Sequence, residues 1–274
     1  MTTHGVSTAD RKGYLIIGGV AACLVFVFAA RFYLGGAPRA DANNCVGTPI
    51  SNTVVLLDRS EWASTQTLEE IRARTLAHVE ALPANERVSV FEITDRSTGD
   101  LRPLFSRCRP KREGEGNRAI ESTRQLKAKY EQSFLEPLRS AMDTVIVGSA
   151  SSPIAQTVTD LTLSQYLRGA ENHLLIFSDM LENTSGFSLY ECGASGNAVE
   201  TFRASRRGAT ERPAFRNTTV LVNIIPRTDV SATTLRCRDQ LWPWFFGDAT
   251  GRTDGVSISY LPGGASTSGS KKLP

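Results

Sequence analysis

An apolar stretch near the N-terminus constrains this chain more than any other feature. No charged side chain occurs from Gly13 to Ala30, a run of 18 residues. Because a helix rises about 1.5 Å per residue, roughly 20 such residues cross the hydrocarbon core of a bilayer, which is about 30 Å thick. Tyr14 and Tyr33 lie near the two ends, where interfacial aromatic side chains are typical. We therefore expect a transmembrane helix over residues 13–34.

A cleaved signal peptide is the alternative for this stretch. The small-x-small pattern that such a peptide needs occurs at Ala40-Asp41-Ala42, which lies further from the apolar run than a signal peptide normally allows. A membrane anchor is therefore the favoured interpretation. By composition, the remaining chain divides into a polar N-terminus, a linker, a folded domain and a tail rich in Gly, Ser and Lys, which we place at residues 1–12, 35–52, 53–261 and 262–274.

Four cysteines follow the apolar stretch, and their spacing indicates the compartment. They are Cys45, Cys108, Cys192 and Cys237, with no C-x-x-C pair and no nearby histidine. Zinc sites need tighter spacing, so we expect two disulfides, in one of the three pairings that four cysteines allow. Buried free thiols in a cytosolic domain are the alternative. Disulfides would place the domain in the periplasm or outside the cell and the N-terminus in the cytoplasm.

Apolar runs rich in β-branched residues alternate with segments of helical periodicity throughout the domain. The expected strands are residues 53–57, 87–93, 101–105, 173–178, 218–225 and 256–260. The expected helices are residues 67–82, 123–148, 154–168, 198–204 and 231–246. Pro137 should interrupt or kink the second of these helices. The alternation predicts an α/β fold with a doubly wound, mostly parallel sheet, helices on both faces and residues 101–105 as an antiparallel edge.

Polar residues follow the expected strands at the ends where a parallel sheet collects its ligands. Asp58-Arg59-Ser60 follows the first strand, Ser151-Ser152-Pro153 precedes the helix at 154, and Asp179 follows the strand that ends at Ser178. These segments, VVLLDRSEWAS, SSPIAQTV and LLIFSDMLENT, resemble those of the von Willebrand factor A family in content and order. That family carries Asp-x-Ser-x-Ser after its first strand, a Thr from a middle loop and an Asp after its fourth strand.

The resemblance covers residues 53–261 and implies a metal-ion-dependent adhesion site that binds Mg²⁺ or another divalent cation. Its oxygen ligands would be Asp58, Ser60, Ser152 and Asp179. The site departs from the family's pattern, since Trp62 occupies the fifth motif position and an indole cannot coordinate a cation. The resemblance therefore implies a degenerate site. The alternative is that both aspartates are helix caps or turn residues, which Asp favours after strands.

Basic side chains gather in two long, irregular segments, residues 107–129 and 203–216. They form either solvated surface or a contact for an acidic partner or for anionic lipid headgroups. The candidates for partner contact are Arg109, Lys111, Arg112, Arg206 and Arg207. The net charge of the whole chain is only +3, so it gives no argument for nucleic-acid binding.

No catalytic set stands out in the sequence. The chain has 3 histidines, none beside a convincing nucleophile, and lacks G-x-S-x-G, Walker and H-E-x-x-H motifs. The favoured function is therefore a protein-binding module rather than an enzyme. It would be tethered to a bacterial inner membrane as a subunit of an envelope assembly for secretion, conjugation, adhesion or sensing. A metal-dependent hydrolase that uses Asp58 and Asp179, or a purely structural subunit, are the alternatives.

Overall fold

A computed structural model of the chain describes residues 8–35, 39–60, 62–94, 99, 101–116, 122–143, 148–193, 196–207, 211–247 and 255–266. The chain divides into two compact units, residues 1–40 and 41–274. The first unit contains helix α1 (Thr8–Gly35), which includes the expected apolar run. Its window Gly13–Ala30 has a mean hydropathy of 2.3 and is 0% buried. By length and composition α1 can cross a membrane.

The second unit is built on a six-stranded sheet in the order β4-β3-β1-β5-β6-β7. Its strands are β1 (Ser51–Asp58), β3 (Arg87–Ile93), β4 (Phe105–Cys108), β5 (Glu171–Ser178), β6 (Thr218–Ile224) and β7 (Val256–Tyr260). All neighbouring strands are parallel except β3 and β4. The short strands β2 (Trp62–Ala63) and β8 (Ala265–Ser266) form a separate antiparallel pair. The mostly parallel sheet with an antiparallel edge is thereby confirmed.

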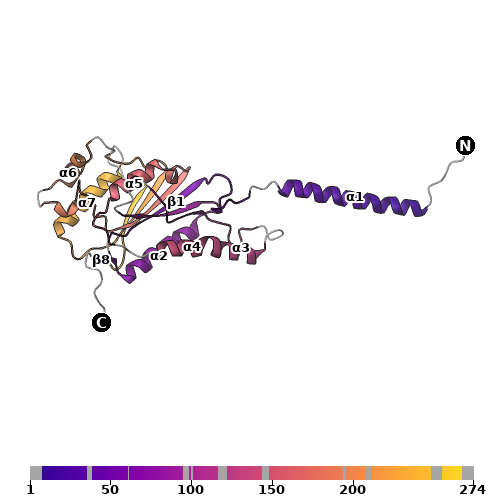
Figure 1. Ribbon diagram of the computed structural model, residues 1–274, viewed down its shortest axis with the longest axis horizontal. Coiled ribbons are helices and arrows are strands. Elements are labelled where there is room, and N and C mark those ends of the chain that lie inside the picture. The colour runs from indigo at the N-terminus through magenta and orange to yellow at the C-terminus, as the bar shows by residue number, and fades with distance from the viewer. Residues whose placement is uncertain are drawn as a thin grey trace. The chain divides into compact units, whose positions relative to one another are not determined.

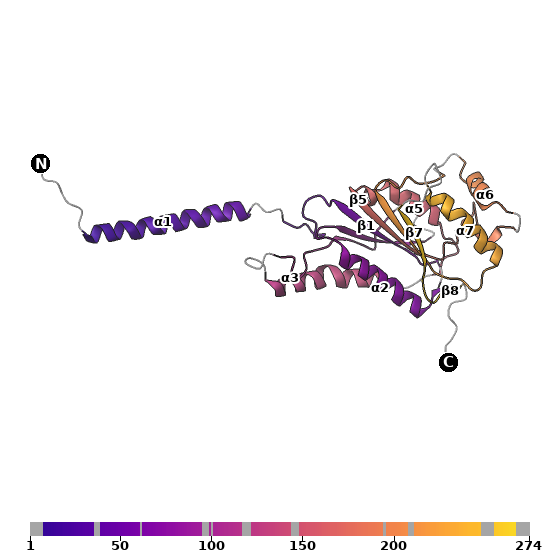
Figure 2. The same cartoon turned by 180° about the vertical axis from the view of Figure 1, so that it is seen from behind.

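Helices cover both faces of this sheet (Figures 1 and 2). One face packs against α2 (Thr65–Ala81), α3 (Thr123–Tyr130), the π-helical segment η1 (Glu131–Leu135) and α4 (Glu136–Met142). The other face packs against α5 (Ile154–Leu163), α6 (Ala198–Ser205) and α7 (Ala232–Phe246). Two 3₁₀ turns, η2 (Gln165–Leu167) and η3 (Leu189–Glu191), lie in the connections. The predicted doubly wound arrangement is confirmed.

Strand β1 shows why the sheet needs cover on both sides. Successive side chains of a strand point to opposite faces. Val54 and Leu56 therefore pack in the core shared with α5 and α7, while Val55 and Leu57 pack in the core shared with α2 and α4. All four are at most 5% exposed. The unbroken apolar run is thus typical of a central parallel strand.

The expected long helix is interrupted next to Pro137, as the sequence predicts. Proline has no N–H to donate to the carbonyl four residues earlier, which belongs to Ser133. That carbonyl instead accepts from Arg107 Nη1 at 2.7 Å and from Asn44 Nδ2 at 3.1 Å. The backbone makes the π-helical turn η1 and continues as α4. The predicted continuation at residues 144–147 lies outside the described residues.

The edge strand β4 begins later than predicted, at Phe105 instead of residue 101. Pro103 cannot donate to a β ladder, so regular pairing with β3 starts only after it. Phe105 lies opposite Val90, and Cys108 lies opposite Arg87. The expected strand therefore shares only Phe105 with β4, which runs on to Cys108, and an antiparallel edge strand is present but displaced along the chain.

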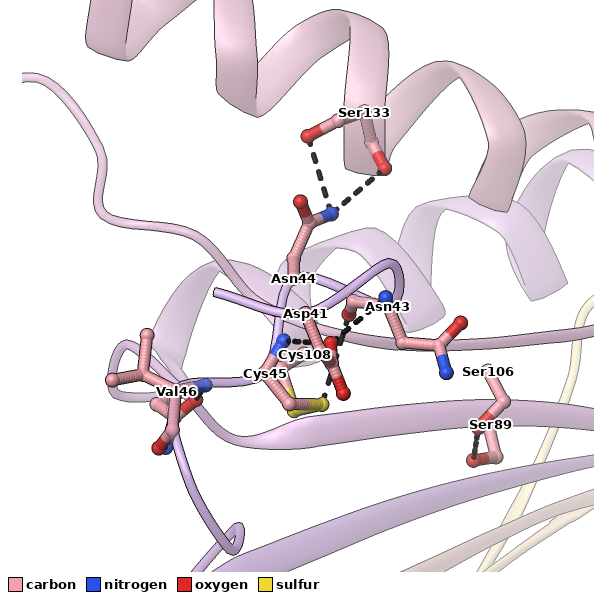
Figure 3. Close-up of a disulfide and its surroundings, with 10 residues drawn as sticks. Asp41, Asn43, Asn44, Cys45, Val46, Ser89, Ser106, Cys108 and Ser133 are labelled. Carbon is pink, nitrogen blue, oxygen red and sulfur yellow. Dashed lines mark hydrogen bonds between the residues drawn. A yellow bond between two sulfur atoms is a disulfide. The ribbon is translucent and has the colours of Figure 1, made fainter. Parts of the chain in front are cut away.

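Two disulfides form, as the cysteine spacing predicts, and the structure selects one of the three pairings. The bonded pairs are Cys45–Cys108 and Cys192–Cys237. The first joins the segment before β1 to the edge strand β4 (Figure 3). There the N–H of Cys108 donates to the carbonyl of Asn43 at 2.8 Å, and Asp41 Oδ1 accepts from the N–H groups of Asn43 and Cys45, each at 2.8 Å. The folded unit therefore begins ahead of β1, within the predicted linker.

Candidate functional site

The carboxylate of Asp58 lies at the end of β1, on the edge where the parallel strands terminate. Its Oδ1 accepts hydrogen bonds from the Ser60 hydroxyl at 2.6 Å and from the Ser60 N–H at 3.1 Å. Its Oδ2 accepts from the hydroxyls of Ser152 at 3.1 Å and Ser178 at 2.6 Å. Three of the four predicted ligands therefore meet, together with Ser178, which the sequence pattern did not single out.

Backbone pairing holds the loops that bring these hydroxyls together. Ser152 and Asn183 exchange two N–H···O bonds of 2.7 and 3.1 Å, so the loop before α5 is tied to the segment after β5. Glu182, which is 3% exposed, accepts from the N–H of Ala155 at 2.8 Å and so caps the start of α5. Burial raises the pKa of Glu182 to about 8, although the Ala155 N–H favours the ionised carboxylate.

Asp179 follows Ser178 at the same edge, but its carboxylate makes different contacts. Its Oδ1 accepts from the N–H of Leu181 at 2.9 Å, which forms an Asx turn. Its Oδ2 accepts from Arg227 Nη1 at 2.7 Å. Burial and the negative charge of Asp58 raise the pKa of Asp179 to about 7, against the opposing effect of the Leu181 N–H and Arg227.

Arg227 belongs to this site, although no motif in the sequence pointed to it. Its side chain is 1% exposed, and it also bonds Asp229 through Nε at 2.7 Å and Nη2 at 3.0 Å. Nη1 reaches the Tyr190 hydroxyl at 3.4 Å as well. Arg227 meets Asp179 because β5 and β6 are parallel neighbours, so the segments that follow them lie side by side. The available signal was an arginine shortly after an expected strand.

The donor set can be compared with what a divalent cation needs. A carboxylate has about four acceptor positions, and at Asp58 neutral donors fill them. The hydroxyl oxygens that donate to Asp58 can still accept a bond. A hard cation also needs the negative charge of carboxylates, however, and the charge of Asp179 is paired with Arg227. Among the described residues, no group of three or more His, Cys, Asp or Glu could hold a metal ion. In this arrangement the predicted ligands do not fit Mg²⁺.

A cavity of about 380 Å³ lies beside Asp58, between the sheet edge and helices α2 and α4. Its apolar wall includes Leu57, Trp62, Leu68, Ile71, Met142 and Phe177. Trp62 is 44% exposed and Leu68 is 38% exposed, so both apolar side chains are partly accessible to solvent. Arg72 and Asp143, which also line the cavity, form an exposed ion pair. The residue that departs from the motif, Trp62, therefore forms part of a hollow in the surface.

Arg109 is a buried structural cation instead of the exposed partner contact that the sequence predicted. It is 1% exposed. Its Nε donates to the carbonyl of Pro83 at 3.0 Å, and Nη1 and Nη2 pair with both oxygens of Glu115, each at 3.0 Å. Although burial acts in the opposite direction, hydrogen bonds from Arg109 and Arg112 lower the pKa of Glu115 to about 2. Charge clustering in sequence could not reveal this burial.

The other four basic candidates are at least partly accessible. Arg112 is half-buried and pairs with Glu115 at 2.9 Å. Arg206 is half-buried, donates to Gln156 Oε1 at 2.8 Å, and packs over the ring of Phe202. Lys111 and Arg207 are exposed. Their role in partner contact stays a prediction.

Comparison with known proteins finds no matching family model and no matching curated protein. Among solved structures, similar folds occur in proximal thread matrix protein 1 from the mussel byssus, with a TM-score of 0.38 and 9% identity, and in the ArnB paralog VWA2 from Sulfolobus acidocaldarius, with 0.38 and 10%. Human COPII-coat protein Sec24c is also similar, with 0.32 and 14%. The matches cover 77%, 78% and 81% of this chain, but only 44%, 41% and 31% of the respective proteins.

Proposed function

We propose that this chain is a membrane-tethered protein-binding module whose domain receives a partner protein at the cavity beside Asp58. The observation that carries the proposal is the apolar cavity of about 380 Å³ with the exposed Trp62 in its wall. Tryptophan is enriched among the residues that dominate binding energy at protein interfaces, where it packs into desolvated pockets. The Trp62 side chain is 44% exposed in the wall of the cavity, so it is available to pack against a partner protein in this way.

The cavity wall indicates the chemistry of the partner. Leu57, Ile71 and Phe177 are buried apolar residues, so a side chain that enters between them gains by leaving water only if it is itself apolar. The exposed ion pair of Arg72 and Asp143 adds polar groups, in keeping with the apolar centre and polar rim of specific interfaces. The partner should therefore present a large apolar side chain that is flanked by polar residues.

The tether in this proposal is α1, supported by the apolar window Gly13–Ala30. The two disulfides support an oxidising compartment for the domain. We place the chain in a bacterial inner membrane, with its N-terminus in the cytoplasm and its domain in the periplasm, as a subunit of an envelope assembly. The full chain should stay in the membrane pellet after alkaline carbonate extraction, and its release into the supernatant would refute the tether.

Site-specific photo-crosslinking in intact cells tests the docking site. A photoreactive residue at Leu68, in the cavity wall, should give a discrete cross-linked partner, whereas the same residue at Glu200, exposed on α6, should not. The full chain in lipid nanodiscs is then titrated with that partner. Trp62→Ala should weaken binding by about 30-fold, the effect of a hot-spot residue.

The matched control is Ile258→Ala, because Ile258 is 46% exposed on the edge strand β7 and does not line the cavity. It should change affinity by less than about twofold. If Trp62→Ala and Ile258→Ala weaken binding equally, or if the Leu68 probe captures nothing, the cavity is not the docking site.

A further inference from the structure

The edge where the sequence predicts a divalent cation already contains a buried positive charge. Arg227 Nη1 lies 2.7 Å from Asp179 Oδ2, and the two side chains are 1% and 4% exposed. The same guanidinium bonds both oxygens of Asp229, at 2.7 and 3.0 Å. Arginine presents five N–H donors in a rigid, planar fork, so contacts to two carboxylates and to Tyr190 hold its orientation.

The partners of the Asp179 and Asp58 carboxylates decide whether a divalent cation can bind between them. A carboxylate removed from water is strongly destabilising unless it is paired or protonated. At Asp179 the pairing comes from Arg227, which is part of the chain itself. At Asp58 neutral hydroxyl and amide groups satisfy both oxygens, and no described cationic side chain forms an ion pair with it. A divalent ion would therefore meet one carboxylate that is already hydrogen-bonded and a second that is held by a guanidinium.

We infer that Arg227 is the built-in counter-ion of this edge, and that it takes the place of a divalent cation at Asp179. The loops that carry Asp58 and Asp179 then fold together without a metal ion, and the positive charge of Arg227 prevents a cation from binding at Asp179. This inference does not depend on which partner the cavity binds. It accounts for the degenerate motif, because a site that needs no metal has no need for a coordinating hydroxyl at position 62.

Metal binding and thermal unfolding of the full chain in detergent micelles test the inference. For the wild type, the unfolding temperature should be equal in EDTA and in millimolar Mg²⁺, and titration with Mn²⁺ should show no stoichiometric binding by electron paramagnetic resonance. Arg227→Gln leaves the buried Asp179 without its counter-ion, so this variant should be less stable in EDTA. Mg²⁺ should then raise its unfolding temperature by about 2–4 °C or more.

Two further variants separate charge from packing. Arg227→Lys keeps the positive charge and should show no response to Mg²⁺. The double variant Asp179→Asn, Arg227→Gln removes both charges, so it should fold without responding to Mg²⁺ even if Arg227→Gln alone does not fold in EDTA. Arg203→Gln is the matched control, because Arg203 is 54% exposed in its pair with Glu211 and should leave metal response and stability nearly unchanged.

Stoichiometric Mn²⁺ binding to the wild type that is lost in Asp58→Ala would overturn the inference. An Arg227→Gln protein whose unfolding temperature is the same in Mg²⁺ and in EDTA would overturn it as well, because the guanidinium would then not be what excludes the cation.

Discussion

Replacing Glu182 by Gln tests how burial at the strand-end edge links the stability of this domain to pH. Glu182 is 3% exposed, and its pKa rises from an ordinary value of 4.5 to about 8 in the folded chain. Between these two values the folded chain binds more protons than the unfolded chain, so the free energy of unfolding falls as pH rises. The stabilising effect of the proton is thus fully present at low pH and is lost as pH rises through about 8.

The size of this effect follows from the two pKa values. Ionisation of Glu182 lowers the free energy of unfolding by under about 1 kcal/mol at pH 5, by about 3 kcal/mol at pH 7 and by about 4 kcal/mol at pH 8. A glutamine oxygen can still accept from the N–H of Ala155, which Glu182 accepts at 2.8 Å, but it cannot ionise. We therefore expect Glu182→Gln to be close to wild type at pH 5 and more stable by about 2–4 kcal/mol at pH 8.

Urea denaturation of the full chain in detergent, followed by tryptophan fluorescence at pH 5, 6, 7 and 8, measures this difference. The chain has 3 tryptophans, at positions 62, 242 and 244, so the signal reports on the domain and not on α1. Glu200→Gln, at an exposed position on α6, is the control and should differ from wild type by a constant, small amount. The reasoning fails if the gap between Glu182→Gln and wild type is the same at pH 5 and pH 8.

The same denaturation assay tests the contributions of the Cys45–Cys108 disulfide and of the buried Arg109 side chain to the stability of the fold. Replacing Cys45 and Cys108 together by Ser removes a cross-link between residues separated by 63 positions, so the free energy of unfolding should fall by about 4 kcal/mol in the chain-entropy model. A loss below 1 kcal/mol would show that this disulfide is not structural. Arg109→Ala should lower the free energy of unfolding by about 2–3 kcal/mol, because it removes a buried side chain and its hydrogen bonds to the Pro83 carbonyl and to the partly exposed Glu115. Arg207→Ala, at an exposed position, should change it by no more than about 0.5 kcal/mol. Equal effects of the two arginine substitutions would contradict the burial of Arg109.

The periodicity of apolar residues predicted most of the secondary structure because it depends on local geometry. The strand expected over residues 87–93 and the one over 256–260 occur with those bounds. The break beside Pro137 was also predictable, since a missing N–H acts within one helical turn. Strands β2 and β8 were not predicted, because each has two residues and pairs with a segment about 200 positions away.

The candidate site was predictable only in part. Asp58 and Ser60 lie together as expected, since residues that end or follow parallel strands share one edge of the sheet. Ser152 precedes α5 and reaches Asp58 because its loop pairs with the backbone of Asn183. Arg227 was not predicted, because its contact with Asp179 spans 48 positions and arises only from the order of strands β5 and β6. Arg109 was predicted to be exposed, because a cluster of charges in sequence carries no information about burial.

By itself the sequence determined that an apolar helix precedes an α/β domain, that the central strands are buried on both faces, and that four cysteines can form disulfides. Each of these properties depends on residue type and local spacing. Only the tertiary structure decided the disulfide pairing, the burial of Arg109, the cavity beside Trp62 and the ion pair between Asp179 and Arg227. The physical reason is that burial and charge pairing depend on which distant segments the sheet order brings together, and the local spacing of residue types does not reveal that order.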